Sequence, residues 1–231
     1  MKIEILHLIE GARKAVGCTV IIDVFRAFSL ESYLYAGGAE KIIAVGDKDL
    51  ALSLGKKIPN AVLIGERRGV KLPDFDFGNS PTDIIKADFN GKTVVHTTSA
   101  GTQGVAAAEC ADVVLGCSLV NAAATAKYIK KQGYETVSIV AMGLDGIQKT
   151  DEDELCAEYL KALLSGRKIE LADKIEKIKT TSGAKFFDKE KQSVFPNTDF
   201  YLCTEVDKFN FALIIRRNHE TGENEVEKIE V

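Results

Sequence analysis

The stretch Thr19-Val20-Ile21-Ile22-Asp23-Val24, followed by helical spacing over residues 27–36 and by Gly37-Gly38, decides the fold class of this chain. The first six residues are an apolar run of strand length, and the paired glycines are a typical helix stop. A strand that leads directly into a helix is the unit from which parallel sheets are built. The stretch therefore predicts an α/β fold.

The same strand-helix unit recurs along the chain. Further strands are predicted at 41–45, 61–64, 92–97, 112–116 and 136–141, and further helices at 48–57, 104–110, 122–132 and 151–164. Asp47 stands where it can cap the helix 48–57. This alternation predicts a three-layer α/β/α architecture, with a largely parallel but mixed sheet covered by helices on both faces.

The pattern changes after about Gly166. Residues 168–180 are charged and favour a surface helix, and residues 199–206 and 211–216 favour a terminal pair of strands. We expect one domain over residues 1–231, in which 167–231 is the candidate for a C-terminal subregion.

Composition narrows the class of protein. The chain has 231 residues and a net charge of -4, and no basic face or tail offsets that charge, so a nucleic-acid partner is not expected. The N-terminus lacks the layout of a signal peptide, and no apolar run approaches the ~20 residues of a membrane span. We predict a cytoplasmic protein without a membrane partner. The five cysteines are scattered singly and predict buried free thiols.

Polar residues follow several of the predicted strands, at the edge where ligands bind in sheets of this kind. They are Asp23 and Arg26, then Glu66, Arg67 and Arg68, then Thr97, Thr98, Ser99, Gly101 and Thr102, then Ser118 and Asn121, and last Gly143, Asp145 and Gly146. We expect these groups to face one common site.

The loop from Gly65 to Pro81 is the most charged of these connections. Glu66, two arginines and a lysine arrive together, and Gly78-Asn79-Ser80-Pro81 closes the loop. Arginines suit a planar anion held by paired hydrogen bonds. Carboxylates without paired His or Cys suit a hard cation, Mg²⁺ before Zn²⁺. The loop therefore predicts a site for an anion and a metal ion.

Three further patterns leave alternatives open. Asp23, at the end of an apolar run, is a metal ligand, general base or nucleophile, or else a structural carboxylate that pairs with Arg26 or caps the next helix. The run from His96 to Thr102 is an anion cradle or a hydroxyl-rich helix cap, and His96 itself is more typical of a satisfied core histidine. Of the four acids in 151–154, only one or two can face a site, and Glu152 and Asp153 are the best candidates. The alternative there is an acidic first turn stabilised by the helix dipole.

Five segments together resemble the 2-phosphosulfolactate phosphatase family. They are 20–27, 65–81, 92–102, 116–122 and 143–157, in the family's order over nearly the whole chain. The resemblance implies a Mg²⁺-dependent phosphoric monoester hydrolase with an α/β/α fold, expected to be a homodimer. Its substrate is a small phosphate ester, and the family's founding reaction converts 2-phosphosulfolactate to 3-sulfolactate and phosphate in coenzyme M biosynthesis.

The predicted roles combine these strand-end residues with the resemblance. Asp23, Arg26 and Glu66 are the expected catalytic residues, and Asp23, Glu66, Glu152 and Asp153 are the expected metal ligands. The expected substrate-binding residues are Arg67, Asn79, Thr98, Gly101, Thr102 and Asn121, with Lys71 as a further cation.

The chain also departs from the family pattern. Ala100 stands in place of an Asn, Arg68 in place of a second Gly, and Lys149-Thr150-Asp151 in place of a segment closer to Phe-Ser-Leu. These changes motivate the alternative of a non-catalytic anion-binding member. A nucleotide-binding protein is a weaker alternative, because no Gly-x-Gly-x-x-Gly follows the first strand of the pattern.

Overall fold

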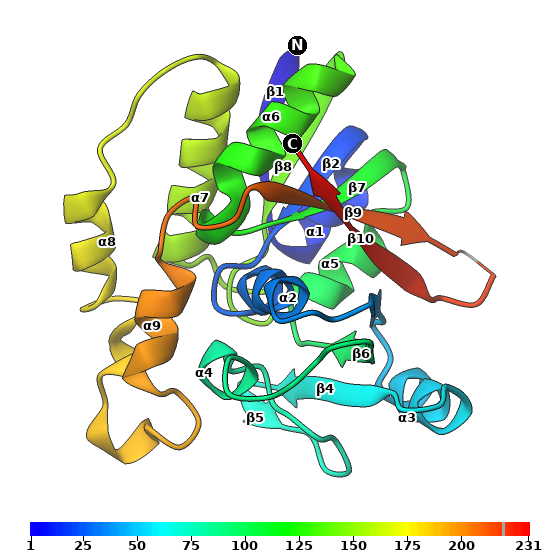
Figure 1. The fold of residues 1–231 in the computed structure, drawn as a ribbon. Helices are drawn as coiled ribbons and strands as arrows, with labels where there is room; N and C mark the ends of the chain where they lie inside the picture. Colours follow the sequence, from blue (N-terminus) through cyan, green and yellow to red (C-terminus); the bar gives the residue numbers. More distant parts are fainter. Residues whose placement is uncertain (219) are drawn as a thin grey trace.

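The structure is a computed structural model that describes residues 1–218 and 220–231. In these residues a ten-stranded sheet has the order β1-β8-β2-β7-β9-β10-β3-β6-β4-β5 (Figure 1). The strands are β1 (Lys2–His7), β2 (Gly17–Ile22), β3 (Lys41–Ala44), β4 (Val62–Arg67), β5 (Val70–Lys71), β6 (Thr93–Thr97), β7 (Ala111–Cys117), β8 (Thr136–Ala141), β9 (Phe211–Arg217) and β10 (Asn224–Glu230).

The sheet is mixed, and its parallel strands form two blocks. β1, β8, β2 and β7 are parallel to one another, as are β3, β6 and β4. The hairpin of β9 and β10 joins the blocks through antiparallel pairs with β7 and β3. The α/β fold class, the mixed sheet and a C-terminal strand pair are confirmed.

Helices cover both faces of the sheet. They are α1 (Leu8–Lys14), α2 (Ala27–Ala36), α3 (Lys48–Lys57), α4 (Pro81–Ile84), α5 (Gly101–Ala107), α6 (Ala122–Gln132), α7 (Asp151–Leu164), α8 (Ala172–Ile178) and α9 (Asn197–Cys203), with 3-10 turns η1 (Leu119–Asn121), η2 (Ala184–Phe186) and η3 (Lys189–Lys191). The apolar cluster under α6 and α7 and the cluster under α3 use alternate residues of the strands on one face. The other face carries α1, α2 and α5.

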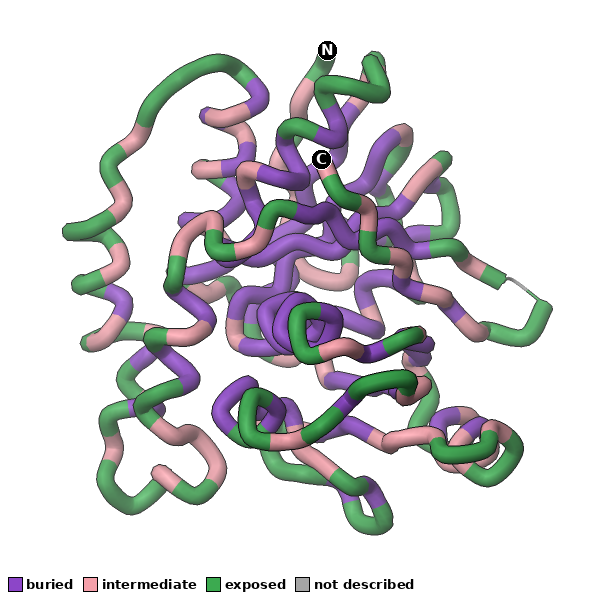
Figure 2. Tube along the Cα trace, viewed as in Figure 1, coloured by how far each residue is buried: buried purple, intermediate pink, exposed green. Residues whose placement is uncertain are grey.

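Helix α2 is the centre of the molecule. Residues 27–35 are all buried, and Figure 2 shows the helix as a purple coil enclosed by other elements. Its apolar side chains share one cluster with strands of both parallel blocks, for example with Ile21 of β2 and Ile64 of β4. The sheet therefore curls around α2, which brings the carboxyl ends of distant strands toward one another.

The C-terminal part differs from the sequence prediction. Residues 199–206 were predicted as a strand, but Asn197–Cys203 form helix α9. The helix follows Pro196, and buried Asp199 in its first turn binds the Ser80–Thr82 segment, so tertiary contacts override the strand propensity of its aromatic residues. The strand pair consists of β9 and β10 instead.

Other local predictions have mixed outcomes. Helices 48–57, 122–132 and 151–164 have the predicted bounds, and Asp47 caps α3 by accepting from two backbone N–H groups. β1 and α1 were not predicted. Four cysteines are buried, but Cys110 is exposed, which corrects the prediction for that residue. None of the helices in residues 1–218 and 220–231 has the length and apolar character needed to cross a membrane.

Candidate active site

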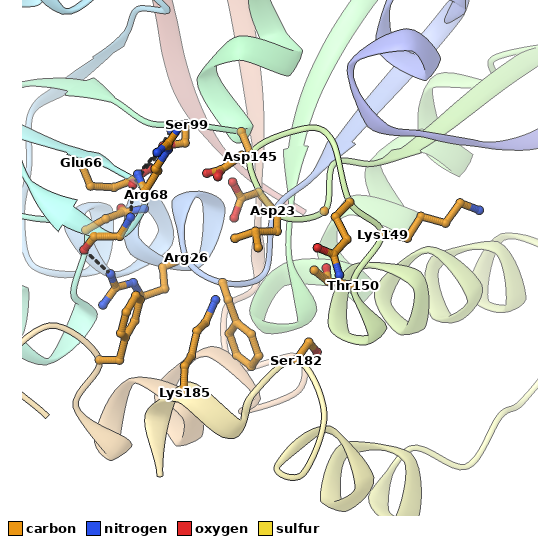
Figure 3. A pocket seen from close by; sticks show the side chains of 18 of the residues that line it. Asp23, Arg26, Glu66, Arg68, Ser99, Asp145, Lys149, Thr150, Ser182 and Lys185 are labelled. Carbon is orange, nitrogen blue, oxygen red and sulfur yellow. Dashed lines mark hydrogen bonds between the residues drawn. The ribbon is translucent and has the colours of Figure 1, made fainter. Parts of the chain in front are cut away.

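A pocket of about 630 Å³ lies at the carboxyl ends of parallel strands (Figure 3). β2 contributes Asp23, β4 leads to Arg68, β6 leads to Ser99, and β8 leads to the 143–151 segment. Residues 181–195 of the C-terminal part line the side of the pocket opposite these strand ends. The lining residues are Asp23, Phe25, Arg26, Glu66, Arg68, Gly69, Asn79, Ser99, Ala100, Gly143, Leu144, Asp145, Gln148, Lys149, Thr150, Asp151, Thr181, Ser182, Lys185 and Phe195.

Asp23 joins the two halves of the sheet. Its Oδ1 accepts from Ala27 N at 3.1 Å, at the start of α2, and its Oδ2 accepts from Gly101 N at 2.8 Å, at the start of α5. Four strands separate β2 from β6 in the sheet order, so this contact depends on the curl around α2. Burial raises the pKa of Asp23 to about 6, and the charges of Glu66 and Glu152 add to the rise.

Glu66 organises the charged loop after β4. Its Oε1 accepts from Ser99 N at 2.7 Å, and its Oε2 accepts from Gly69 N at 2.6 Å. Gly69 has φ +81°, and a Cβ there would lie 2.3 Å from a ring atom of Phe195. A side chain at this position would therefore be strained and would also collide with the pocket wall.

The first turn of α7 places two acids inside the protein. Glu152 and Asp153 are buried, whereas Asp151 is exposed. Asp153 accepts from Val24 N at 2.8 Å and from Gly143 N at 2.7 Å, so it ties together the loops after β2 and β8. Burial, followed by the charges of Glu152 and Asp23, raises the pKa of Asp153 well above its usual range.

Glu152 is the least satisfied of the acids. Burial raises its pKa, and interactions with Ser182 and Lys185 offset part of the rise. Its Oε2, together with Thr150 Oγ1 and Ser182 Oγ, is buried without a hydrogen-bond partner among the described residues. Unpartnered buried oxygens are costly, so this corner favours a bound cation or hydrogen-bond donor.

Two of the predicted arginines are engaged by the protein itself. Arg26 donates to Val194 O, to Asp199 Oδ2 and to Gly69 O at 2.9, 2.8 and 3.2 Å. Arg67 lies outside the pocket lining, and its guanidinium donates to Glu66 O, Gly46 O and Thr97 Oγ1. Lys71, outside the lining as well, donates to Phe75 O. These three cations hold the backbone around the pocket.

Two other cations are available to a ligand. The side chains of Arg68 and Lys185 donate no hydrogen bond to any residue within 1–218 and 220–231, and both line the pocket. Figure 3 shows the amino end of Lys185 directed toward the pocket, whereas that of Lys149 points away from it. Lys185 Nζ lies 5.4 Å from the ring centre of Phe186 and 5.3 Å from that of Phe195.

Lys185 was missed by the sequence analysis. It lies in η2, far along the chain from the strand-end loops, and no spacing in the sequence connects it to them. Ser182 of the same segment was missed for the same reason. The packing of Phe186 and Phe200 with Leu155 of α7 and with Phe25 helps to place this segment on the pocket wall.

The predicted anion cradle has a different arrangement. Thr98 and Thr102 bind each other, with Thr98 N donating to Thr102 Oγ1 at 2.9 Å and Thr102 N to Thr98 Oγ1 at 3.2 Å. Gly101 holds Asp23, and Asn121 accepts from Ser118 N at the start of η1. These residues lie outside the pocket lining, so their predicted substrate contacts stay predictions. Of the predicted site residues, Asp23, Arg26, Glu66 and Asn79 line the pocket.

The fold and the site define an α/β protein with a charged pocket over the carboxyl ends of its parallel strands. Residues 4–218 match the sequence model of the 2-phosphosulpholactate phosphatase family, and the chain belongs to that family. The predicted family is thereby confirmed, and with it the enzyme class, phosphoric monoester hydrolase.

Similar proteins carry the same description. A Bacillus subtilis protein named "Probable 2-phosphosulfolactate phosphatase" is 33% identical over 205 residues, which are 87% of this chain and 88% of the relative. A protein of that name from Carboxydothermus hydrogenoformans is 38% identical over 75% of this chain and 72% of its own length. One from Thermoplasma volcanium is 33% identical over 81% of this chain and 84% of its own length.

Proposed function

We propose that the pocket hydrolyses a small polyanionic phosphate ester in a Mg²⁺-dependent reaction, with 2-phosphosulfolactate as the substrate and 3-sulfolactate and phosphate as the products. This is the reaction type of coenzyme M biosynthesis. The observation that carries the proposal is the meeting of Asp23 with two unengaged cations, Arg68 and Lys185, in one pocket. The names of the relatives support the choice of substrate.

The charges of the pocket fit an ester with several anionic groups. Arg68 follows β4, while Lys185 belongs to η2 on the C-terminal side, so two anionic groups of one molecule can each meet a cation. Lys185 is half-buried and its amine lies beside phenyl rings, which screen charge less than water does, so its attraction for an anion is strengthened. A neutral phosphate-free ligand would leave these cations without partners.

The acids fit Mg²⁺ when the substrate completes the site. In the described ranges, no group of three or more His, Cys, Asp or Glu side chains is arranged to hold a metal. Mg²⁺ is commonly held by one or two carboxylates plus phosphate oxygens of the substrate. Asp23 and the unpartnered Oε2 of Glu152 are the groups that would hold it, with Glu66 and Asp153 holding the surrounding loops. Bound Mg²⁺ would neutralise phosphate charge.

The chain's own residues then perform binding and proton transfer. Hydrolysis breaks the ester P–O bond, transfers the oxygen of water to phosphorus and leaves a proton on the alcohol oxygen. A carboxyl group with a pKa of about 6 exchanges protons readily near neutral pH, which suits Asp23 to one of these transfers. Arg68, Lys185 and Asn79 bind the anionic groups.

Release of phosphate from 2-phosphosulfolactate tests the proposal. We expect turnover with Mg²⁺ that is lost with a chelator and restored by added Mg²⁺. Turnover of other phosphate esters but not of 2-phosphosulfolactate would overturn the substrate. No turnover on a broad ester panel, with a raised melting temperature in phosphate or sulfolactate, would instead favour the anion-binding alternative.

A matched pair of variants tests the role of Asp23. We expect Asp23→Asn to lower kcat at least a hundredfold, the scale of a lost acid-base group. Asp145→Asn removes another carboxylate of the same pocket. We expect it to lower kcat far less, and equal losses in both variants would contradict a specific role for Asp23.

The proposal includes a homodimer. It predicts a solution mass of twice the 25.1 kDa chain mass, measured by light scattering during gel filtration. A mass equal to that of one chain would overturn it without affecting the proposed reaction.

A further inference from the structure

A buried polar chain leads from the interior to Asn79 in the pocket, and its two inner members, Glu31 and His96, have no part in the proposed reaction. Glu31 of α2 and His96 of β6 are completely buried, and Asn79 is 4% exposed. His96 Nδ1 lies 2.8 Å from Glu31 Oε1, and His96 Nε2 lies 3.2 Å from Asn79 Oδ1. Asn79 also lines the pocket, so the chain runs from the centre of the fold to the ligand site.

Both ring nitrogens of His96 face oxygen atoms. A carboxylate oxygen and an amide oxygen only accept hydrogen bonds, and each faces one ring nitrogen. Each ring nitrogen is therefore placed to donate, as in an imidazolium ring that pairs with the buried Glu31 carboxylate. Burying either charge alone would be costly, which explains why the two occur together.

The ion pair fixes the direction of the Asn79 amide. Because Oδ1 accepts from His96, the Nδ2 hydrogens are directed elsewhere, and they donate to no residue within the described ranges. Asn79 lines the pocket, so these hydrogens are free to bind a ligand. A neutral His96 that donates to Glu31 would instead accept at Nε2, which would turn the amide and present its oxygen to the pocket.

We propose that Glu31 and His96 are positioning residues that hold the Asn79 amide as a hydrogen-bond donor to an anionic oxygen of the ligand. The inference rests on the proposed function in one respect, that the ligand of the pocket is an anion. It adds two residues to the site: Glu31, at the centre of a helix and outside every strand-end pattern, and His96, which the sequence analysis favoured as a core histidine.

Binding of inorganic phosphate, followed by calorimetry, tests the effect on affinity. Hydrogen bonds to a charged group contribute enough that we expect Asn79→Ala to weaken binding roughly tenfold to a hundredfold. Glu31→Gln keeps the shape but removes the charge, so we expect a similar loss. The double variant, Glu31→Gln with Asn79→Ala, is expected to bind phosphate as weakly as Asn79→Ala alone, because Glu31 acts only through the Asn79 amide. Additive losses would overturn the proposal.

Ser32→Ala is the matched control. Ser32 is the next residue of α2 and is also completely buried. It donates to Phe28 O and has no hydrogen bond to Glu31, His96 or Asn79. We expect it to leave phosphate binding unchanged. A loss of phosphate affinity equal to that of Glu31→Gln would show that any disturbance of α2 weakens phosphate binding. It would contradict a specific effect of Glu31 through His96 and Asn79.

Nitrogen-15 spectra of the imidazole rings test the proton positions in the unaltered protein. We expect His96 to show two protonated ring nitrogens, and one bare nitrogen in Glu31→Gln. A bare ring nitrogen in the unaltered protein would overturn the inference even if no variant folds. Failure of the unaltered protein to bind phosphate would overturn the anion ligand of the proposed function instead, and the two failures are thereby distinguished.

Discussion

Arg26 Nη1 donates to Asp199 Oδ2 at 2.8 Å, and the two side chains are 4% and 0% exposed. Asp199 also accepts at Oδ1 from Ser80 Oγ, Thr82 N and Thr82 Oγ1. One buried carboxylate therefore joins the end of the charged loop, the start of α2 and helix α9. The pair holds the C-terminal part against the strand ends, and the pocket exists between these parts.

Removal of one partner of this pair is expected to destabilise the protein. Asp199→Ala leaves the Arg26 guanidinium buried without its carboxylate, a change that costs about 3–5 kcal/mol of the free energy of unfolding. Urea unfolding measures it. Lys174→Ala is the control, because Lys174 pairs with Glu158 on the surface. We expect no measurable shift of the unfolding midpoint for Lys174→Ala. Equal shifts in both variants would contradict a special role of the Arg26–Asp199 pair in holding the C-terminal part.

The neighbouring arginines Arg67 and Arg68 are expected to differ when each is replaced by Met. Arg68→Met removes an unengaged cation of the pocket, so we expect KM to rise about tenfold with little change in melting temperature. Arg67→Met leaves Thr97 Oγ1 without its donor and removes one of the donors to Gly46 O, so we expect a loss of about 1–3 kcal/mol of stability.

The opposite pattern would support a direct substrate contact by Arg67. A rise in KM for Arg67→Met with unchanged stability would favour the role predicted for it from the charged loop. Steady-state kinetics and urea unfolding on the same preparations separate these outcomes.

The sequence located part of the pocket from the residues that follow parallel strands, and it missed the residues placed by packing. Asp23 and Glu66 were predicted because strand ends converge on one edge of any parallel sheet, and Asn79 was predicted from the charged loop and the family resemblance. Lys185 reaches the pocket through aromatic packing of residues distant in sequence, which leaves no local pattern. Arg67 and Arg68 are adjacent and chemically alike, and only the contacts of Arg67 with Gly46 and Thr97 separate their roles.

The same limit explains the fold errors. The interior of α2 was predicted as a helix, but its burial on every side follows from the curl of the sheet and not from its own spacing. Residues 199–206 have strand propensity, yet the bonds of Asp199 to Ser80 and Thr82 favour the helix. β10 is polar at five of its seven positions and was not predicted, and one of its two pairing partners, β3, is far away in the sequence.

Gly69 is expected to be far less tolerant of a side chain than a surface glycine of similar backbone conformation. Gly133 has φ +72°, and a Cβ added there would have no atom within 4 Å, so Gly133→Ala should cost about 1–2 kcal/mol of stability from backbone strain alone. Gly69→Ala adds the collision with Phe195, and overpacking typically costs about 1–3 kcal/mol more. Equal losses on urea unfolding would show that Phe195 moves aside freely.

The protonation of Asp23 is expected to make stability depend on pH. Its pKa rises from 3.8 in the unfolded chain to about 6 in the fold, so the folded protein binds the extra proton between these values. The resulting stabilisation is complete below pH 3.8 and is lost as the pH rises through 6. In metal-free buffer, the unfolding free energy of the unaltered protein minus that of Asp23→Ala should fall by on the order of 1 kcal/mol between about pH 5 and 7.

The control is Ser29→Ala, which removes a buried non-titrating group bonded to Val24 O. Its difference from the unaltered protein should stay constant, and a constant difference for Asp23→Ala as well would contradict the raised pKa.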